Sequence, residues 1–182
     1  MSGRFDPVAG VARVALGRAD GVERFGGTVQ SFLASLAPLV AFPLAGALIE
    51  LIHGGFVPAL SLLLVTLVAQ LAPLVLSHAL AARWGREPLW LRYATAYNWC
   101  YWALPVIALA FVFVLGIATT GGLPEMLAAR MVVIGLGAYS LWLHWFLARH
   151  ALHLTRGKAA LLVVLVNAGT LALAFAPALL AS

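Results

Sequence analysis

Cysteine and charge are the two features that this sequence has least of. The single cysteine, Cys100, among 182 residues cannot form an internal disulfide, and it cannot build a zinc site from several thiolates. Charged residues make up only 9% of the chain, whereas hydrophobic residues make up 64%, against about half in a soluble domain. The composition therefore predicts an integral membrane protein.

Motifs of hydrolysis, phosphate binding and zinc binding are also missing, since the chain contains no G-x-S-x-G, P-loop or H-E-x-x-H. Of its six acidic residues, only Glu50 lies within an apolar segment, and intramembrane acid–base chemistry normally needs more. We therefore expect no enzymatic activity and no cofactor. The formal net charge is +5, but the basic residues fall in short clusters between apolar segments, so we expect no nucleic-acid partner.

Five apolar segments are long enough to cross a bilayer core, which takes about 20 helical residues. They comprise residues 32–51, 56–78, 98–117, 127–147 and 159–180. Only four residues separate the first two segments, which predicts an antiparallel helical hairpin. The fold class expected is all-α, with a five-helix transmembrane domain over residues 28–182.

Residues 1–27 are too polar for the apolar core of a signal peptide, so no cleaved leader is expected. Asp6 as cap and Pro7 in the first turn predict a helix over residues 7–18. We expect this helix to lie on the inner membrane surface beside anionic lipid, or else to be an ordinary solvated helix. Residues 17–27, which contain Gly17, Gly21, Gly26 and Gly27, are expected to form a flexible link.

The basic residues alternate between the two sides of the predicted bundle. Four precede the first segment, three lie between the second and third, and three lie between the fourth and fifth, so ten of the 11 share one side. Because Lys and Arg are retained in the cytoplasm, the pattern predicts a cell inner membrane protein with an internal N-terminus and an external C-terminus.

Aromatic residues crowd the start of the third segment. Tyr93, Tyr97 and Tyr101 recur every four residues and so share a helix face. All six tryptophans are expected at the inner interface, where amphipathic rings prefer the headgroup level; the alternative is a ligand-binding cluster. This predicted belt comprises Trp84, Trp90, Trp99, Trp102, Trp142 and Trp145.

Isolated polar residues within the apolar segments predict contacts between helices. Asn98, Gln70 and Asn167 have no charged neighbour in sequence, and amides in hydrocarbon more often bond across helices than bind a ligand. Pro105 has no amide hydrogen, so it frees the carbonyl of Tyr101 and predicts a kink in the third helix.

Glu50 and Arg130 are opposite charges at similar predicted depth, near the outer ends of the first and fourth segments. A lone charge at the centre of a bilayer costs about 2.5–3.5 kcal/mol. Three arrangements are open: an interhelical pair of these residues, an Arg130 side chain that extends to the outer interface, and a pair of Arg130 with Glu125.

His78 and His144 both lie near the inner ends of their segments, and two such residues are able to ligate a haem between helices. Against this, His144 lies between Trp142 and Trp145, within the predicted belt. A haem-binding redox subunit is therefore kept only as the least favoured hypothesis.

Two stretches resemble the Ypt-interacting-protein (Yip) family of five-span membrane proteins. They are SHALAARWGREPLWLRYATAYNWCYWALPV and WLHWFLARHALHLTRGKAALLVVL, each a segment end followed by a basic loop and the next segment. The resemblance implies a membrane scaffold that acts through helix packing with itself or with other membrane proteins, in contact with lipid. A small transporter or channel subunit is the alternative hypothesis.

Overall fold

The computed structural model describes residues 5–180, apart from the side chains of Pro38 and residues 175–180. The described part is all-helical and contains no strand. Its elements are α1 (Pro7–Ala15), η1 (Ala19–Arg24), α2 (Val29–His53), α3 (Phe56–Arg83), α4 (Glu87–Trp102), α5 (Leu104–Thr120), α6 (Glu125–Ala151) and α7 (Arg156–Leu180). Five helical stretches are long and apolar enough to span a membrane, with α4 and α5 counted as one stretch. The predicted five-helix multi-pass fold is confirmed.

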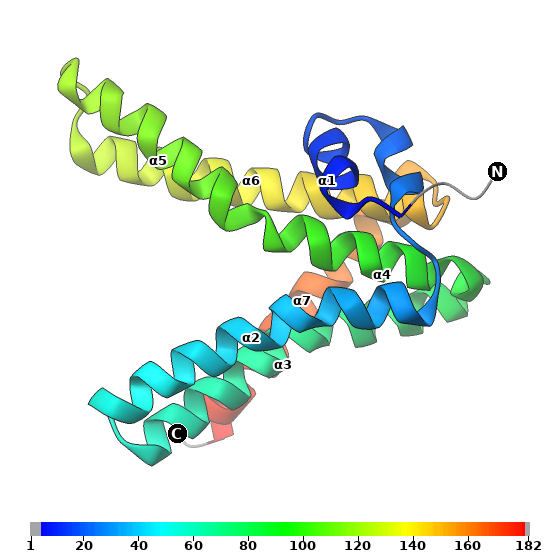
Figure 1. The fold of residues 1–182 in the computed structure, drawn as a ribbon, viewed down its shortest axis with the longest axis horizontal. Helices are drawn as coiled ribbons and strands as arrows, with labels where there is room; N and C mark the ends of the chain where they lie inside the picture. Colours follow the sequence, from blue (N-terminus) through cyan, green and yellow to red (C-terminus); the bar gives the residue numbers. More distant parts are fainter. Residues whose placement is uncertain (1–4, 181–182) are drawn as a thin grey trace.

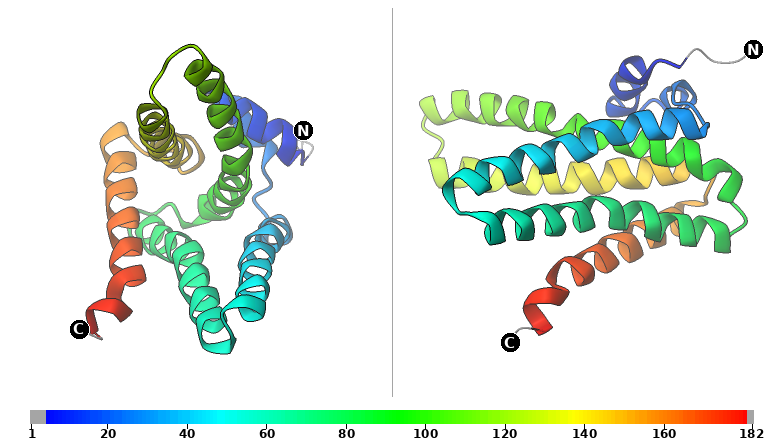
Figure 2. Two further views of the ribbon diagram at one scale, coloured as in Figure 1. Left: turned by 90° about the vertical axis from the view of Figure 1, so that its left-hand side faces the viewer. Right: turned by 60° about the horizontal axis from the view of Figure 1, so that its bottom comes forward.

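The long helices form two arms that diverge from a common end (Figure 1). One arm contains α2, α3 and α7, and the other contains the hairpin of α5 and α6. Helix α4 lies between the arms, where it packs against α2 and α6, while α6 and α7 also pack together. Figure 2 shows the same two arms from the side and from below. The arms therefore meet at one end of the molecule.

The third span is broken by a proline, as its sequence predicts. Helix α4 ends at Trp102, and α5 begins at Leu104 with Pro105 in its first turn. Pro105 has no N–H to donate to the carbonyl of Tyr101, and α5 begins with the amides of Val106 and Ile107, which donate to the carbonyl of Ala103 at 3.0 and 3.2 Å. The helical part is longer than expected, because it begins at Glu87 rather than at residue 98.

The N-terminal segment packs on the meeting end of the arms. Asp6 caps α1 by accepting a hydrogen bond from the amide of Ala9 at 3.0 Å. The flexible link expected for residues 17–27 is wrong, because this region forms η1, which packs against α1, α4 and α6. Phe25, directly after η1, is only 1% exposed, and burying such a ring contributes about 1.5–3 kcal/mol.

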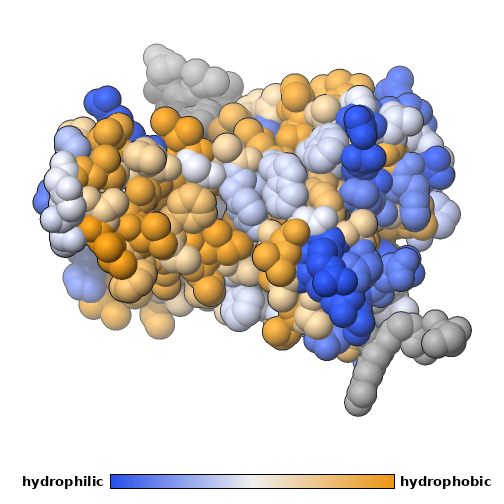
Figure 3. Space-filling model, turned by 90° about the horizontal axis from the view of Figure 1, so that it is seen from above, coloured by the Kyte–Doolittle hydropathy of each residue, from blue (hydrophilic) through white to orange (hydrophobic). Residues whose placement is uncertain are grey.

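The buried core lies at this same end. Val14, Tyr93, Leu147 and Leu162 come from four different helices and are fully buried in one cluster. Helix α5, in contrast, has no buried residue. Figure 3 shows hydrophilic residues gathered toward one end of the molecule and hydrophobic residues over most of the rest. The packed polar end and the apolar arms are the two regions expected of a membrane protein whose helices extend beyond the hydrocarbon.

Candidate functional site

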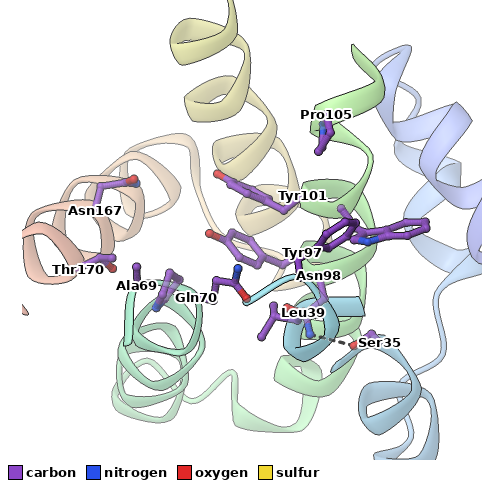
Figure 4. Close-up of a pocket in the computed structure, with 13 residues that line it drawn as sticks. Ser35, Leu39, Ala69, Gln70, Tyr97, Asn98, Tyr101, Pro105, Asn167 and Thr170 are labelled. Atoms are coloured by element: carbon purple, nitrogen blue, oxygen red, sulfur yellow. Dashed lines mark hydrogen bonds between the residues drawn. The ribbon is translucent and has the colours of Figure 1, made fainter. Parts of the chain in front are cut away.

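A cavity of about 480 Å³ lies where the arms begin to diverge (Figure 4). Its lining comes from α2, α3, α4, α5 and α7, so every part of the bundle except α6 contributes to it. The wall is mostly apolar, with a few amide and hydroxyl groups and four aromatic rings. Pockets of this size and composition are typical sites for small molecules.

Asn98 on α4 reaches α2 through a hydrogen bond, as its sequence context predicts. Its Nδ2 donates to Oγ of Ser35 at 2.9 Å, and Ser35 Oγ in turn donates to the carbonyl of Phe32 at 2.6 Å. Because the Ser35 hydroxyl already donates its only hydrogen to Phe32, it can only accept from Asn98. The nitrogen of the Asn98 amide must therefore face Ser35, which fixes the orientation of the amide. Asn98 Oδ1 is then left buried without a hydrogen-bond partner, in a residue that is 3% exposed.

Gln70 on α3 does not form the interhelical hydrogen bond expected for it. Its side chain instead lines the cavity, and its Oε1 is buried without a partner. A buried acceptor that lacks a partner costs about 1–3 kcal/mol. The cavity wall therefore contains two unsatisfied amide oxygens, from Gln70 and Asn98, on the facing helices α3 and α4 (Figure 4).

Tyrosines of α4 form another part of the wall. The rings of Tyr97 and Tyr101 are stacked, with centroids 4.1 Å apart and planes inclined by 24°. The hydroxyl of Tyr101 donates to the carbonyl of Ser140 on α6 at 3.1 Å, which fixes the ring between α4 and α6. The four-residue spacing of these tyrosines predicted the shared face, but not that the face borders a cavity.

A buried polar chain beside the cavity connects three helices. Asn167 on α7 donates through Nδ2 to the carbonyl of Val163 at 2.8 Å, and the same Nδ2 lies 3.3 Å from Nδ1 of His144 on α6. Nε2 of His144 lies 2.8 Å from the hydroxyl of Tyr93 on α4. Since the amide nitrogen donates, Nδ1 is the acceptor, and His144 is the neutral tautomer with its hydrogen on Nε2. The interhelical contact predicted for Asn167 is confirmed.

This chain bears directly on the haem hypothesis. Both ring nitrogens of His144 are engaged with protein groups, so neither has a free lone pair for an iron ligand. His78 lies on α3 with its Nε2 3.6 Å from Glu87 and its ring edge against Trp90. Coordination of a haem by these two histidines would require the Tyr93–His144–Asn167 chain to break.

Glu50 and Arg130 do not form the interhelical pair. In the described part of the chain, ion pairs join Asp20 to Arg13 and Arg18, and the Glu87 carboxylate lies 3.6 Å from Nε2 of His78. Glu50 lies on α2 and Arg130 on α6, in different arms (Figure 1), and the Glu50 carboxylate turns back over Gly54 in the hairpin loop. The two side chains do not meet because α2 packs on α3 and α4 rather than on α6. Extension of Arg130 to the outer interface remains a prediction.

The six tryptophans have different surroundings. Trp90 donates through Nε1 to Ser77 and Trp145 donates to the carbonyl of Arg156, both at 3.2 Å, while Trp102 is 45% exposed and lines the cavity. Trp90 and Trp102 are twelve residues apart on one helix, about 18 Å along its axis. The interfacial belt stays a prediction. If α4 crosses the membrane, its tryptophans do not all lie at the same depth.

Several polar residues of the site had no distinguishing sequence signal. Ser35 and Thr170 line the cavity from α2 and α7, but single hydroxyl residues in apolar helices are common and usually bond their own helix. Only a view of which helices face one another selects them.

Comparison of the chain with models of protein families, with curated proteins and with solved structures finds no match. The Yip resemblance therefore stays a prediction.

Proposed function

We propose that this protein is a small carrier or channel-type subunit that binds an amphiphilic molecule in the cavity between its arms. The observation that supports this most directly is that Asn98, a residue of the cavity lining, has a buried Oδ1 with no hydrogen-bond partner in the described structure. Buried polar atoms in folded proteins are almost always hydrogen-bonded, and an exception at a cavity is typical of a ligand site.

The position of the broken helix supports the same proposal. Pro105 and the last two residues of α4, Tyr101 and Trp102, all line the cavity. Membrane transporters commonly form their binding sites where a spanning helix is interrupted, because the interruption exposes backbone polar groups to the ligand. Here the interruption and the unsatisfied amide oxygens occur in the same place.

We also propose that the polar end of the bundle faces the cytoplasm of a cell inner membrane. Nine of the described basic residues lie in α1, in η1, in the turn between these two elements, or in or next to the ends of α3, α4, α6 and α7 that meet there. Retention of basic residues in the cytoplasm then orients the N-terminus inward. Reporter fusions at Arg86 and at Ser182 test this: the first should report cytoplasm and the second the outside, and the reverse result would refute the orientation.

Filling the cavity tests the binding proposal. Ala69 lines the cavity from α3, whereas Ala110 is exposed on α5, so Ala69→Phe and Ala110→Phe are a matched pair. The probe is 6-bromohexan-1-ol, whose bromine quenches tryptophan on contact, added to the protein in nanodiscs. We expect saturable quenching in the unmodified protein and in Ala110→Phe, and only linear quenching in Ala69→Phe. Equal saturable quenching in both variants would refute the proposal.

A second candidate function is the membrane scaffold of Yip type, acting with other membrane proteins or with a second copy. It is favoured by helix α5, which has no buried residue and, among the described elements, packs mainly on α6 and to a small extent on α4. Probe flux in proteoliposomes distinguishes the two functions. Flux that Ala69→Phe abolishes supports a carrier, whereas absence of flux together with stable association of copies supports a scaffold.

A further inference from the structure

We infer that the cavity selects an amphiphile with a primary ammonium head group, which donates several hydrogen bonds and carries a positive charge. This inference deepens the proposed function and rests on it. It is argued from the orientation of the amide groups, from the aromatic wall and from an adjoining apolar cavity.

The polar groups that await a partner are acceptors. Ser35 fixes the Asn98 amide so that its Oδ1, rather than its Nδ2, is free. Gln70 presents a second buried oxygen from the facing helix α3. An ammonium has three N–H donors to offer such acceptors, whereas a carboxylate or phosphate has only acceptors and would leave the two oxygens unpaired.

The wall also favours positive charge. Tyr97, Tyr101, Trp102 and Phe42 all line the cavity, and the ring of Phe42 lies 6.2 Å from that of Trp102. Aromatic faces attract cations electrostatically, most strongly where water is excluded. None of the described residues that line the cavity is charged, so the aromatic faces and the amide oxygens decide the preference for a cation over an anion.

The remainder of the ligand has an apolar place to lie. A second cavity, of about 450 Å³, is lined by Leu104, Ala108 and Leu136, and it shares Tyr101 and Pro105 with the first. Tyr101 and Pro105 therefore border both cavities. An alkyl chain attached to the ammonium can pass the Tyr101 ring and pack between α5 and α6, where each buried methylene contributes favourably.

Four bromohexyl probes that differ only in their head groups test this selectivity. They are 6-bromohexylammonium, (6-bromohexyl)trimethylammonium, 6-bromohexan-1-ol and 6-bromohexanoate, each titrated into nanodiscs while saturable tryptophan quenching is measured. We expect the primary ammonium to bind about tenfold more tightly than the trimethylammonium, which has the charge but no N–H, as the loss of one good hydrogen bond predicts. The alcohol should bind more weakly than the ammonium, and the carboxylate should show no saturable quenching.

Gln70→Leu is the decisive variant, because the described side-chain hydrogen bonds include none from Gln70, so the change breaks no hydrogen bond of the fold. It should lower ammonium affinity about tenfold and leave trimethylammonium affinity unchanged. Asn98→Leu should do the same, but it also removes the bond to Ser35, so Gln70→Leu keeps the inference testable if Asn98→Leu fails to fold.

Two outcomes would overturn the inference, and they differ in what they say of the proposed function. Saturable quenching that depends on Ala69 but is equal for all head groups, or strongest for the carboxylate, refutes ammonium selectivity and leaves the binding site standing. Absence of saturable quenching for all four probes refutes both.

Discussion

Nε2 of His144 lies 2.8 Å from the hydroxyl of Tyr93, although the two residues are 51 positions apart in sequence. The contact joins α6 to α4, and Asn167 extends it to α7. Both His144 and Tyr93 are almost completely buried. This polar chain connects the two arms beside the cavity and is expected to fix the angle between them.

Loss of either end of the chain should destabilise the fold. Tyr93→Phe leaves the Nε2 hydrogen of His144 unpaired, and Asn167→Leu leaves its Nδ1 unpaired, so each change should cost about 1–3 kcal/mol of unfolding free energy. Because both act through one ring, the double variant should differ from the sum of the single changes. Unfolding in detergent measures this, with Tyr139→Phe as a half-buried control that should cost about 0.5–1.5 kcal/mol at most. Strict additivity would contradict the chain.

The Asn98–Ser35 bond yields a second prediction. Ser35→Ala removes the acceptor of a buried amide and should lower the free energy of unfolding by about 1–3 kcal/mol. Ser140→Ala is the matched control, since the Ser140 hydroxyl is exposed and bonds only the carbonyl of Gly137 in its own helix. The two variants should differ clearly in midpoint temperature, and equal midpoints would mean that the Ser35 bond contributes nothing.

Replacement of Gly21 in η1 by alanine is predicted to destabilise the N-terminal segment, whereas the same change at Gly27 is predicted to be tolerated. A Cβ on Gly21 would lie 2.9 Å from both the carbonyl oxygen of Gly10 and the amide nitrogen of Val14, which are backbone atoms that cannot move aside. A Cβ on Gly27 would meet nothing closer than 3.7 Å. Gly21→Ala should cost about 1–3 kcal/mol and release η1 from α1, so that trypsin cleaves after Arg18 and Arg24 faster than in Gly27→Ala. Equal cleavage rates would refute this packing.

Acid should loosen the same N-terminal segment. Partial desolvation raises the pKa of Asp20, but hydrogen bonds and positive charge from Arg18 and Arg13 outweigh this, so the pKa lies below its usual range. A carboxyl with a lowered pKa stabilises the folded state above its unfolded pKa, and this stability is lost as pH falls through the folded value. Amide hydrogen exchange in residues 7–25, corrected for intrinsic rate, should therefore rise on acidification, and Asp20→Asn should remove most of that rise. An unchanged rise in Asp20→Asn would contradict the role of the pair.

The number of spanning helical stretches could be predicted from the sequence because it depends on local hydrophobicity. Lipid-facing segments such as α2 and α5 read as continuous apolar runs, and Pro105 marks its own break. The start of α4 at Glu87 was missed because this part of the helix lies outside the apolar run, and charged residues such as Arg92 are typical of a loop between spans. The η1 segment was missed because the glycines in and around it indicate flexibility in sequence, whereas Gly21 within it serves close packing in the fold.

The candidate site was only partly predictable, because it depends on which helices are neighbours. Asn98 and Asn167 stood out as amides in apolar helices, and both bond across helices. Glu50 and Arg130 were predicted at similar depth in the membrane, but they lie in different arms (Figure 1). The order of spans in a sequence gives the depth of a residue, but it does not say which helices are neighbours. The partners Ser35 and His144 became recognisable only once α2, α4, α6 and α7 were placed side by side.

Native mass spectrometry of the protein released from host-membrane nanodiscs tests the central claim, that the cavity holds a small amphiphile, most directly. We predict a bound molecule of discrete mass on the unmodified protein and on Ala110→Phe, and its loss from Ala69→Phe, whose added ring fills the cavity. The same adducts on all three proteins, or none on any of them, would contradict the claim.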